Sequence, residues 1–284
     1  MTATFAAQLC GYRKNGAPST SDASQAGSVE WGRALFRELG IPDDQPEVAD
    51  IGRRVEDLVI ADLLGMRDDL TIDRSQFIRA FDQYQHLGVF DRFRSSYVGP
   101  TMALDEVLEQ FALVPKHAAL TKAARLIEKV KTGAAADDQR VQDLIDTMPE
   151  ESLLKLDVTV SEPGEVGRLL IGLSAKWSLR TDRAQDCLAQ GSKLVSMRRG
   201  PMPHYATLTM EPRPSMLRLL AYGSGAVDCV YHLALPELRA AAAALDASKR
   251  TKSASQQCAS IERMVAQGRL RDYDDLKAEV RRLR

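Results

Sequence analysis

Two apolar runs joined by a short polar turn constrain the fold of this chain more than any other feature. Residues 153–160 read LLKLDVTV, residues 168–177 read RLLIGLSAKW, and the segment SEPGEVG lies between them. Short runs rich in valine, isoleucine and leucine on either side of a Gly- and Pro-containing turn are typical of paired strands. We therefore expect a β-hairpin or two adjacent strands here. Further strand patterns at HYATLTME and AVDCVYHLA alternate with helical segments, so the second half predicts an α/β fold.

The first half of the chain has mainly helical patterns. Apolar residues recur at helical spacing from residue 48 to Gly65, and residues 103–147 are predicted to be helical with an interruption at TGAAADD. The aromatic residues between 74 and 98 are expected to pack in a helical core. The tail from residue 253 is also predicted to be helical and is highly charged. No internal repeat and no clear linker divides the 284 residues, so we expect one domain.

The composition is that of an ordinary globular protein. Apolar residues make up 44% of the chain and charged residues 27%, and the formal net charge is −1. No apolar run approaches the roughly 18 residues that a membrane span needs, and the basic residues near the start are in the wrong order for a signal peptide. No CxxC pair occurs among the four cysteines, Cys10, Cys187, Cys229 and Cys258. We therefore expect a soluble cytoplasmic protein that has no membrane partner.

The chain contains a locally basic segment although its net charge is close to zero. Between residues 176 and 199 the only acids are Asp182 and Asp186, which leaves a surplus of four positive charges in 24 residues. The basic residues of the segment are Lys176, Arg180, Arg183, Lys193, Arg198 and Arg199. A basic face on a chain that is neutral overall is compatible with an anionic partner, so the charge distribution matters more than the total.

Asp157 lies inside an apolar strand pattern, where a carboxylate is unfavourable unless it is paired or holds a metal ion. A pair with a nearby Lys or Arg, or a position on a solvated edge strand, is the simpler explanation. Alternation places Ser174 and Lys176 on one face of the following strand, so all three side chains could converge. A carboxylate and a main-chain carbonyl there would suit a hard cation such as Mg²⁺, and the lysine could stabilise charge on a phosphate. This pattern has low specificity by itself.

Arg180, Asp182 and Arg183 form a donor–acceptor–donor set at the start of a predicted helix. Arginine makes its best bidentate contact with guanine in the major groove, and aspartate can accept from the cytosine amino group. The set therefore suits G·C pairs. The alternative is that Asp182 caps the helix and the arginines lie on a solvated corner.

Four further segments form an ordered series: SAKWSLRTDRAQ (174–185), GSKLV (191–195), TMEPRPS (209–215) and GSGAVDCVYHLALPEL (223–238). This series closely resembles the NgoMIV-type restriction endonucleases. The resemblance is dense over about 170–240 and looser at STSDASQAGSVEWGRALFREL and GRRVEDL in the first half. These type II enzymes cut sites with a CCGG core and belong to the PD-(D/E)xK superfamily.

The resemblance implies a restriction-endonuclease-like α/β core, with a mixed central β-sheet flanked by helices and a largely helical N-terminal half. A single endonuclease domain would then span 1–284, with a helical part and DNA-contacting arm in 1–150, the catalytic core in 151–250 and a helical tail in 251–284. It further implies Mg²⁺-dependent hydrolysis of both strands of duplex DNA at a palindrome containing CCGG. A palindromic site implies a homodimer or a tetramer.

The resemblance also implies roles for individual residues. The expected catalytic residues are Asp157, Ser174, Lys176 and Glu56; the expected metal ligands are Asp157, Glu56 and the main-chain carbonyl of Ala175. The expected DNA-reading residues are Arg180, Asp182 and Arg183, with Ser24 in the N-terminal arm and Met216 at the outer base pair.

The chain departs from the family pattern near the expected metal site. Leu156 replaces the proline that usually precedes the metal-binding aspartate, and the insertion between the two active-site strands is shorter. Gln190 stands fourteen residues after Lys176, where the family has a glutamate. An amide is not an anionic ligand, so a second metal site is in question, although Glu56 or Asp186 could compensate.

A further departure concerns the outer base pair of the site. Met216 and Ala49 occupy positions where the family would have an arginine and a glutamine. Methionine cannot make the guanine contact but can pack on a thymine methyl group. We therefore expect an outer pair other than G·C, such as that of ACCGGT.

Two other function classes remain open. Gln190 is compatible with a sequence-specific DNA-binding protein whose nuclease site is impaired. The near-neutral charge is compatible with an α/β enzyme or regulatory module that binds no nucleic acid. His204 and His232 lack further ligands at metal spacing, so we expect them to be core or hydrogen-bonded residues.

Overall fold

The computed structural model describes residues 3–115, 118–147, 154–223, 225–249 and 251–283. The chain divides into two compact units, Met1–Gln85 with Leu154–Arg284 and His86–Leu153. The first unit contains the sheet and every residue that the sequence singled out as a candidate for the functional site.

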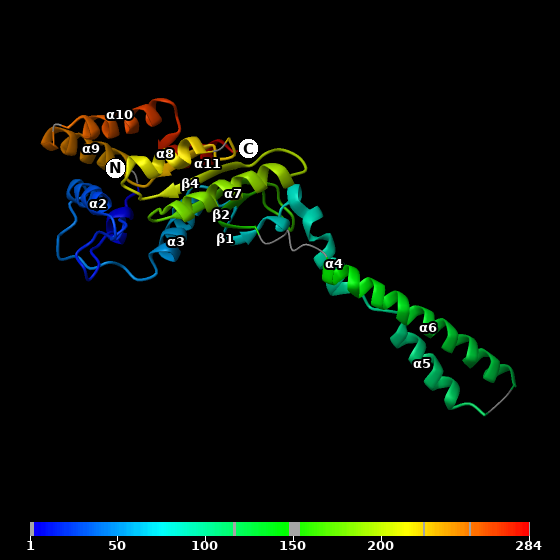
Figure 1. Ribbon diagram of the computed structural model, residues 1–284. Coiled ribbons are helices and arrows are strands. Elements are labelled where there is room, and N and C mark those ends of the chain that lie inside the picture. Colours follow the sequence, from blue (N-terminus) through cyan, green and yellow to red (C-terminus); the bar gives the residue numbers. More distant parts are fainter. Residues whose placement is uncertain (1–2, 116–117, 148–153, 224, 250, 284) are drawn as a thin grey trace. The chain divides into compact units, whose positions relative to one another are not determined.

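The described residues form one sheet of six strands, which lie in chain order. They are β1 (Thr71–Phe77), β2 (Lys155–Ser161), β3 (Leu169–Lys176), β4 (His204–Thr209), β5 (Cys229–His232) and β6 (Leu270–Asp272); β1, β2 and β4 are labelled in Figure 1. β2 is antiparallel to both of its neighbours, β1 and β3, and β3 to β6 are parallel. The predicted mixed α/β fold is therefore confirmed, and the expected hairpin is the β2–β3 pair.

The helices of the first unit flank this sheet. They are α1 (Ala6–Leu9), α2 (Ala26–Glu38), α3 (Ile51–Leu64), α7 (Thr181–Met197), α8 (Pro214–Gly223), α9 (Leu235–Lys249), α10 (Lys252–Ala266) and α11 (Tyr273–Arg282), with 3₁₀ turns at Ile78–Ala80 and Asp82–Gly88. Helix α3 packs against β1, β2 and β3, and α8 packs against β5. Since β3 is covered in this way, six of its eight residues are buried, including Leu169 and Leu173.

The second unit is helical. It contains α4 (Val89–Ser96), α5 (Thr101–Ala112) and α6 (Ala118–Thr147), and α5 packs against α6 (Figure 1). The predicted interruption at TGAAADD is wrong, because α6 runs through it without a break. Three consecutive alanines, the strongest helix formers, follow Gly133 and offset its unfavourable propensity.

Three further expectations need correction. β1 lies in the half predicted to be helical, and β6 lies in the tail predicted to be helical. Both carry polar residues, so neither shows the apolar run that identifies a buried strand, and pairing with a neighbour defines them. The segment 74–98 is a strand end, two 3₁₀ turns and α4 rather than a helical core; Tyr84 is buried, whereas Phe93 is 37% exposed.

Helix α7 lies close to the sheet because Gly191 has no side chain. A Cβ atom at this position would lie 2.9 Å from the Tyr205 ring on β4 and 2.8 Å from the carbonyl oxygen of Ala226. Such distances are shorter than real Cβ contacts, so a larger residue would push α7 away from β4. The first turn of α7, with Asp182 and Arg183, lies next to the end of β3 because only four residues separate Lys176 from Thr181.

Within the ranges that the structure describes, no helix combines the length and the apolar character needed to cross a membrane.

Acid is expected to destabilise the fold through His232. This side chain is fully buried at the end of β5, where Nδ1 accepts from the Ala234 N–H at 3.0 Å and Nε2 lies 3.2 Å from the Glu211 carbonyl. Burial lowers the pKa of His232 from 6.5 to about 4. As the pH falls from 6.5 to about 4, His232 binds a proton in the unfolded chain but not in the folded chain. The free energy of unfolding therefore falls over this range by on the order of 3 kcal/mol.

Urea unfolding of the wild type and of His232→Asn between pH 4.5 and 8 measures this contribution. We expect the pH slope below 6.5 to be smaller in the variant. His204→Asn is the matched control. Burial would lower the pKa of His204, but its hydrogen bonds to Asp228 and Cys229 outweigh burial and raise it to about 9. The contribution of His204 is therefore constant below pH 6.5 and is lost between 6.5 and 9. Equal acid slopes in all three proteins would contradict the assignment.

Candidate functional site

Asp157 lies where β2 and β3 run side by side, and three donors from β3 reach one of its oxygens. Its Oδ2 accepts from the Ala175 N–H at 2.8 Å, from Lys176 Nζ at 2.7 Å and from Ser174 Oγ at 3.3 Å. The side chains of Asp157 and Lys176 are 22% and 23% exposed. The structure thus brings Asp157, Ser174 and Lys176 together, and the ion pair of the simpler explanation is present as well.

The strand register explains this convergence. Because β2 and β3 are antiparallel with Val158 opposite Leu173, the chain direction carries Asp157 toward Ser174. Leu156 and Val158, on either side of Asp157, are completely buried. Alternation then turns Asp157 to the other face of the strand, toward the end of β3.

Glu56 on α3 adds a second carboxylate to this place. Burial, followed by the negative charge of Asp157, raises the pKa of Glu56 to about 7, although Arg74 and Lys176 oppose the shift. Two carboxylates that raise each other's free energy in this way are stabilised by a cation between them. The sequence predicted the helix that carries Glu56, and the packing of α3 on β1, β2 and β3 brings Glu56 to Asp157.

The oxygen ligands at this place fit Mg²⁺. In the described part of the chain, no group of three His, Cys, Asp or Glu side chains converges in the manner of a complete metal centre. Mg²⁺ commonly takes one or two carboxylates from the protein and completes its coordination with water and substrate phosphates. Glu56 and Asp157 are such a pair, and the main chain of Ala175 lies beside Asp157, to which its N–H donates.

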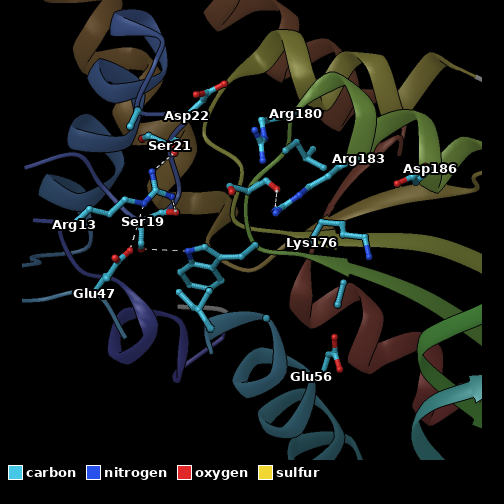
Figure 2. Close-up of a pocket in the computed structure, with 17 residues that line it drawn as sticks. Arg13, Ser19, Ser21, Asp22, Glu47, Glu56, Lys176, Arg180, Arg183 and Asp186 are labelled. Carbon is cyan, nitrogen blue, oxygen red and sulfur yellow. Dashed lines mark hydrogen bonds and ion pairs between the residues drawn. The ribbon is translucent and has the colours of Figure 1, made fainter. Parts of the chain in front are cut away.

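A cavity with a volume of about 770 Å³ joins the carboxylate site to the basic segment (Figure 2). Glu56 and Lys176 line one part of it. Arg180, Arg183 and Asp186 line another part, and Ser19, Ser21 and Asp22 of the N-terminal arm line it as well. An extended anionic ligand could therefore contact the arginines and Lys176 at the same time.

The first turn of α7 presents its charged residues to solvent. Arg180 is the N-cap residue, and Asp182 lies in the first turn and makes no capping hydrogen bond, so the alternative in which Asp182 caps the helix is wrong. Arg180, Asp182 and Arg183 are all exposed, and Arg183 makes a weak contact of 3.5 Å with the Ser178 carbonyl. These groups are available to a ligand, because the fold uses little of their hydrogen-bonding capacity.

The N-terminal arm (residues 13–28) is folded back on itself. Arg13 donates to the carbonyls of Ser21 and Ser19 at 2.7 and 2.8 Å, and Trp177 Nε1 donates to Ser19 Oγ at 3.2 Å. Ser24 is exposed and donates to Asp22 at 2.7 Å. The arm thereby lies beside the end of β3, as a DNA-contacting arm requires.

The two residues expected near an outer base pair, Met216 and Ala49, differ in burial. Met216 on α8 is partly buried and packs against the core, whereas Ala49 is exposed just before α3. Neither is among the described residues that line the cavity. The structure does not bring Met216 and Ala49 into the site, and their roles stay predictions.

Gln190 is joined to the site through buried polar groups. The Tyr205 hydroxyl donates to the Cys187 carbonyl at 2.9 Å and lies 3.2 Å from Gln190 Oε1. Cys187 Sγ lies 3.5 Å from Ser174 Oγ, which in turn contacts Asp157. Gln190 therefore lies behind the carboxylate site, on the same face of α7 as Cys187 and Asp186.

Sequence reasoning missed the buried ion pair between Glu211 and Arg213. Glu211 is completely buried and Arg213 is 5% exposed, and Arg213 Nε donates to Glu211 Oε1 at 2.6 Å. A signal was available, because Glu-Pro-Arg directly follows the strand pattern HYATLTM. Charged residues next to such a pattern are rarely buried unless they are paired.

Comparison with known proteins matches this site to one family. Residues 150–281 match the family described as NgoMIV restriction enzyme. The chain is also 30% identical over 179 residues to the type II restriction enzyme NgoMIV of Neisseria gonorrhoeae. The matched region covers 58% of this chain and 62% of that protein, which is less than two thirds of its length. The family match includes β2 to β6, and so includes Asp157, Lys176 and the first turn of α7.

Proposed function

We propose that this protein is a type II restriction endonuclease, because residues 150–281 match the NgoMIV restriction enzyme family. It hydrolyses both strands of duplex DNA at a palindromic site with a CCGG core, in a Mg²⁺-dependent reaction. One observation carries the proposal: Lys176, which is paired with Asp157, lines the same cavity as Glu56, Arg180 and Arg183. A site that cuts and a surface that reads bases are then adjacent, as site-specific cleavage requires.

The residues of the carboxylate site have complementary roles. Asp157 and Glu56 would hold the cation together with the Ala175 carbonyl, and the Ser174 hydroxyl and the Ala175 N–H orient the Asp157 carboxylate. When bound, Mg²⁺ supplies Lewis-acid polarisation of the scissile phosphate and lowers the pKa of water. Lys176, released from its bond to Asp157 Oδ2, donates to the phosphate and stabilises the negative charge that develops there.

The first turn of α7 reads the bases. Arg180 and Arg183 donate to guanine O6 and N7, and Asp182 accepts from the cytosine amino group. Ser24 contacts the DNA from the N-terminal arm. Met216 and Ala49 leave the outer pair without a guanine contact, so the preferred site is ACCGGT. Asp186 lies on the cavity wall and could add a further carboxylate to the metal site.

A palindromic site requires two copies of this surface related by two-fold symmetry, so the acting species is a homodimer or a tetramer. The partner is duplex DNA, and an enzyme that cuts incoming DNA works in the cytoplasm.

A second candidate function rests on Gln190. If the missing glutamate leaves too little negative charge for metal binding, the protein is a sequence-specific DNA-binding protein with an impaired nuclease site. Binding to CCGG sites without cleavage in Mg²⁺ or Mn²⁺ would favour this alternative.

Cleavage of defined DNA tests the proposal. The full chain is incubated with Mg²⁺ and either a plasmid with one ACCGGT site, one with GCCGGC, or one without CCGG, and the fragment ends are mapped. We expect Mg²⁺-dependent cutting at ACCGGT, weaker cutting at GCCGGC and none without CCGG. The nuclease assignment would be overturned if none of the three plasmids were cut and if Lys176→Ala bound DNA no differently from the wild type.

Replacing Gln190 with glutamate is expected to lower the Mg²⁺ concentration that gives half-maximal cleavage, by about threefold to tenfold. The Tyr205 hydroxyl can still donate to the new carboxylate, and the added charge strengthens the attraction for a divalent cation. The measurement is a Mg²⁺ titration of the single-turnover rate. Gln185→Glu makes the same change at an exposed position of the same helix and is the control. An equal response in both variants would show that Gln190 has no special relation to the metal site.

A further inference from the structure

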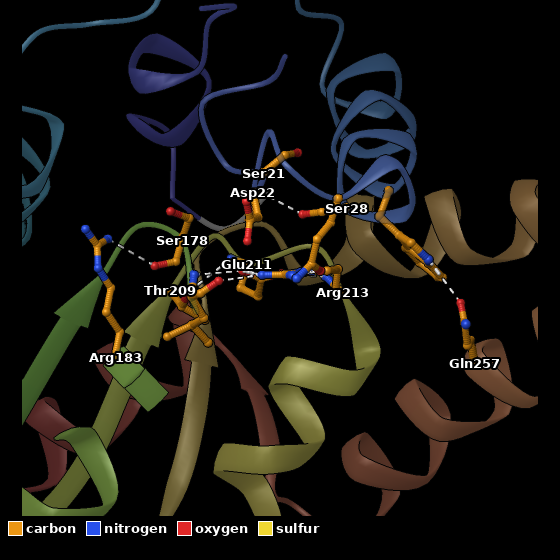
Figure 3. Close-up of polar contacts among 12 residues, drawn as sticks. Ser21, Asp22, Ser28, Ser178, Arg183, Thr209, Glu211, Arg213 and Gln257 are labelled. Carbon is orange, nitrogen blue, oxygen red and sulfur yellow. Dashed lines mark hydrogen bonds and ion pairs between the residues drawn. The ribbon is translucent and has the colours of Figure 1, made fainter. Parts of the chain in front are cut away.

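Glu211 and Arg213 form a buried ion pair where β4 ends and α8 begins (Figure 3). The Glu211 carboxylate accepts four hydrogen bonds. Oε1 accepts from Arg213 Nε at 2.6 Å and from the Arg213 N–H at 3.0 Å. Oε2 accepts from the Leu179 N–H at 2.7 Å and from Arg213 Nη2 at 3.2 Å. Both carboxylate oxygens are thus fully used, and one of the partners belongs to another segment of the chain.

That segment is the turn that leads into α7. Leu179 donates its N–H to Glu211 and accepts at its carbonyl from Arg213 Nη2, so both of its main-chain groups are held by the ion pair. The next residue is Arg180, the N-cap of α7, followed in the first turn by Asp182 and Arg183. The ion pair therefore sets the position of the main chain directly before the proposed base-reading residues.

The same guanidinium also reaches the N-terminal arm. Arg213 Nη1 donates to Gln25 Oε1 at 2.8 Å, and Gln25 is the N-cap residue of α2 at the end of the arm. Ser24 and Asp22 are hydrogen-bonded to each other immediately before it. One planar side chain thus ties two segments that lie more than 150 residues apart in the sequence.

The main chain that carries the ion pair is itself well held. The Glu211 N–H donates to Thr209 Oγ1 at 3.0 Å, and the Glu211 carbonyl lies 3.2 Å from His232 Nε2. A buried ion pair adds little net stability compared with apolar residues of similar size, because both charges lose their hydration. What apolar residues could not supply is the directional fork of donors that fixes Leu179 and Gln25.

We propose that Glu211 and Arg213 are positioning residues for DNA recognition. They hold the turn before α7 and the N-terminal arm at one spacing before DNA arrives, so that binding does not have to order either segment. This inference rests on the proposed function. It predicts that the pair acts on discrimination between sites rather than on hydrolysis, because Asp157 and Lys176 are positioned by contacts within β2 and β3.

Two measurements on Glu211→Gln test the inference. The first is hydrogen exchange of residues 177–183 in the DNA-free protein, which we expect to be faster than in the wild type. The second compares single-turnover cleavage of a CCGG duplex and of a duplex with one changed base pair. We expect the preference for CCGG over the changed duplex to fall by about tenfold, mainly because the enzyme concentration that half-saturates cleavage of CCGG rises. The cleavage rate on CCGG at saturating enzyme should change by less than about threefold. Arg213→Lys keeps the charge but not the fork and should behave like Glu211→Gln.

The controls separate positioning from stability. Glu262→Gln breaks a two-bonded ion pair with Arg239 between α9 and α10 and should leave exchange and discrimination unchanged. Gln25→Ala changes an exposed residue, so it should fold normally and lower discrimination by about threefold even if Glu211→Gln does not fold. The inference would be overturned if Glu211→Gln folded and showed the same hydrogen exchange and site discrimination as the wild type. Unchanged discrimination in Gln25→Ala would overturn it as well. A wild type that neither binds nor cuts CCGG would instead overturn the proposed function, and faster exchange in Glu211→Gln would still show that the pair holds the turn.

Discussion

Asp157→Asn is expected to lower the single-turnover cleavage rate in Mg²⁺ by about a hundredfold to a thousandfold or more. The substitution removes one of the two carboxylates that would hold the cation, and with it the ion pair of 2.7 Å to Lys176. Asparagine keeps an acceptor for the Ala175 N–H and the Ser174 hydroxyl, so the fold should change little. The rate is measured with enzyme in excess over a CCGG duplex, and unfolding is monitored in parallel.

A matched control exists on the same sheet. Asp228 accepts hydrogen bonds from the Tyr205 N–H and from His204 Nδ1, both at 2.9 Å, but it lies beside the start of β4, which pairs with Ile171 and Gly172 and not with the Lys176 end of β3. Asp228→Asn should therefore keep nearly full activity. DNA binding supplies a second check, because Asp157→Asn removes negative charge facing the phosphates and should bind DNA at least as tightly as the wild type. Full cleavage by Asp157→Asn would exclude Asp157 as a metal ligand.

Arg183→Ala is expected to relax the recognition of CCGG. A bidentate contact between arginine and guanine is worth about 1–3 kcal/mol, so the preference for CCGG over a site with one changed pair should fall by about tenfold to a hundredfold. Stability should be almost unchanged, because Arg183 is exposed and its contact with Ser178 is weak. The measurement is the ratio of cleavage rates on duplexes that differ at one base pair.

Arg198→Ala is the control for charge. Arg198 is exposed at the C-terminal end of the same helix, so both variants lose one positive charge from α7. If Arg198 contacts DNA at all, it contacts phosphate, and its loss should weaken binding to all sequences equally. A uniform loss of affinity in Arg183→Ala, with its site preference intact, would assign Arg183 to the backbone and not to the bases.

The site could be predicted from sequence in those parts that depend on neighbouring strands. Asp157, Ser174 and Lys176 lie on two consecutive strands, so alternation and a short turn predicted that they could meet. Arg180, Asp182 and Arg183 follow directly, because a helix start after a strand exposes its first turn. Glu56 could be placed on a helix, but its approach to Asp157 depends on how α3 packs on the sheet.

Other parts could not be predicted in this way. β1 and β6 carry polar residues and are strands because a neighbouring strand supplies their hydrogen-bond partners. The aromatic residues between 74 and 98 suggested a helical core, yet their segment turns through a strand end and two 3₁₀ turns. In both cases local propensity is weak, and long-range pairing decides the structure.

The sequence by itself determined the α/β class, the β2–β3 pair and the order of the charged residues at its end, because these follow from periodicity along a continuous segment. Only the tertiary structure decided which distant residues join them. It buries Glu211 and Arg213 together, turns the N-terminal arm toward the start of α7 and brings Glu56 to Asp157. The physical reason is that burial and hydrogen bonding between remote segments depend on packing in three dimensions, and no period in the sequence encodes them.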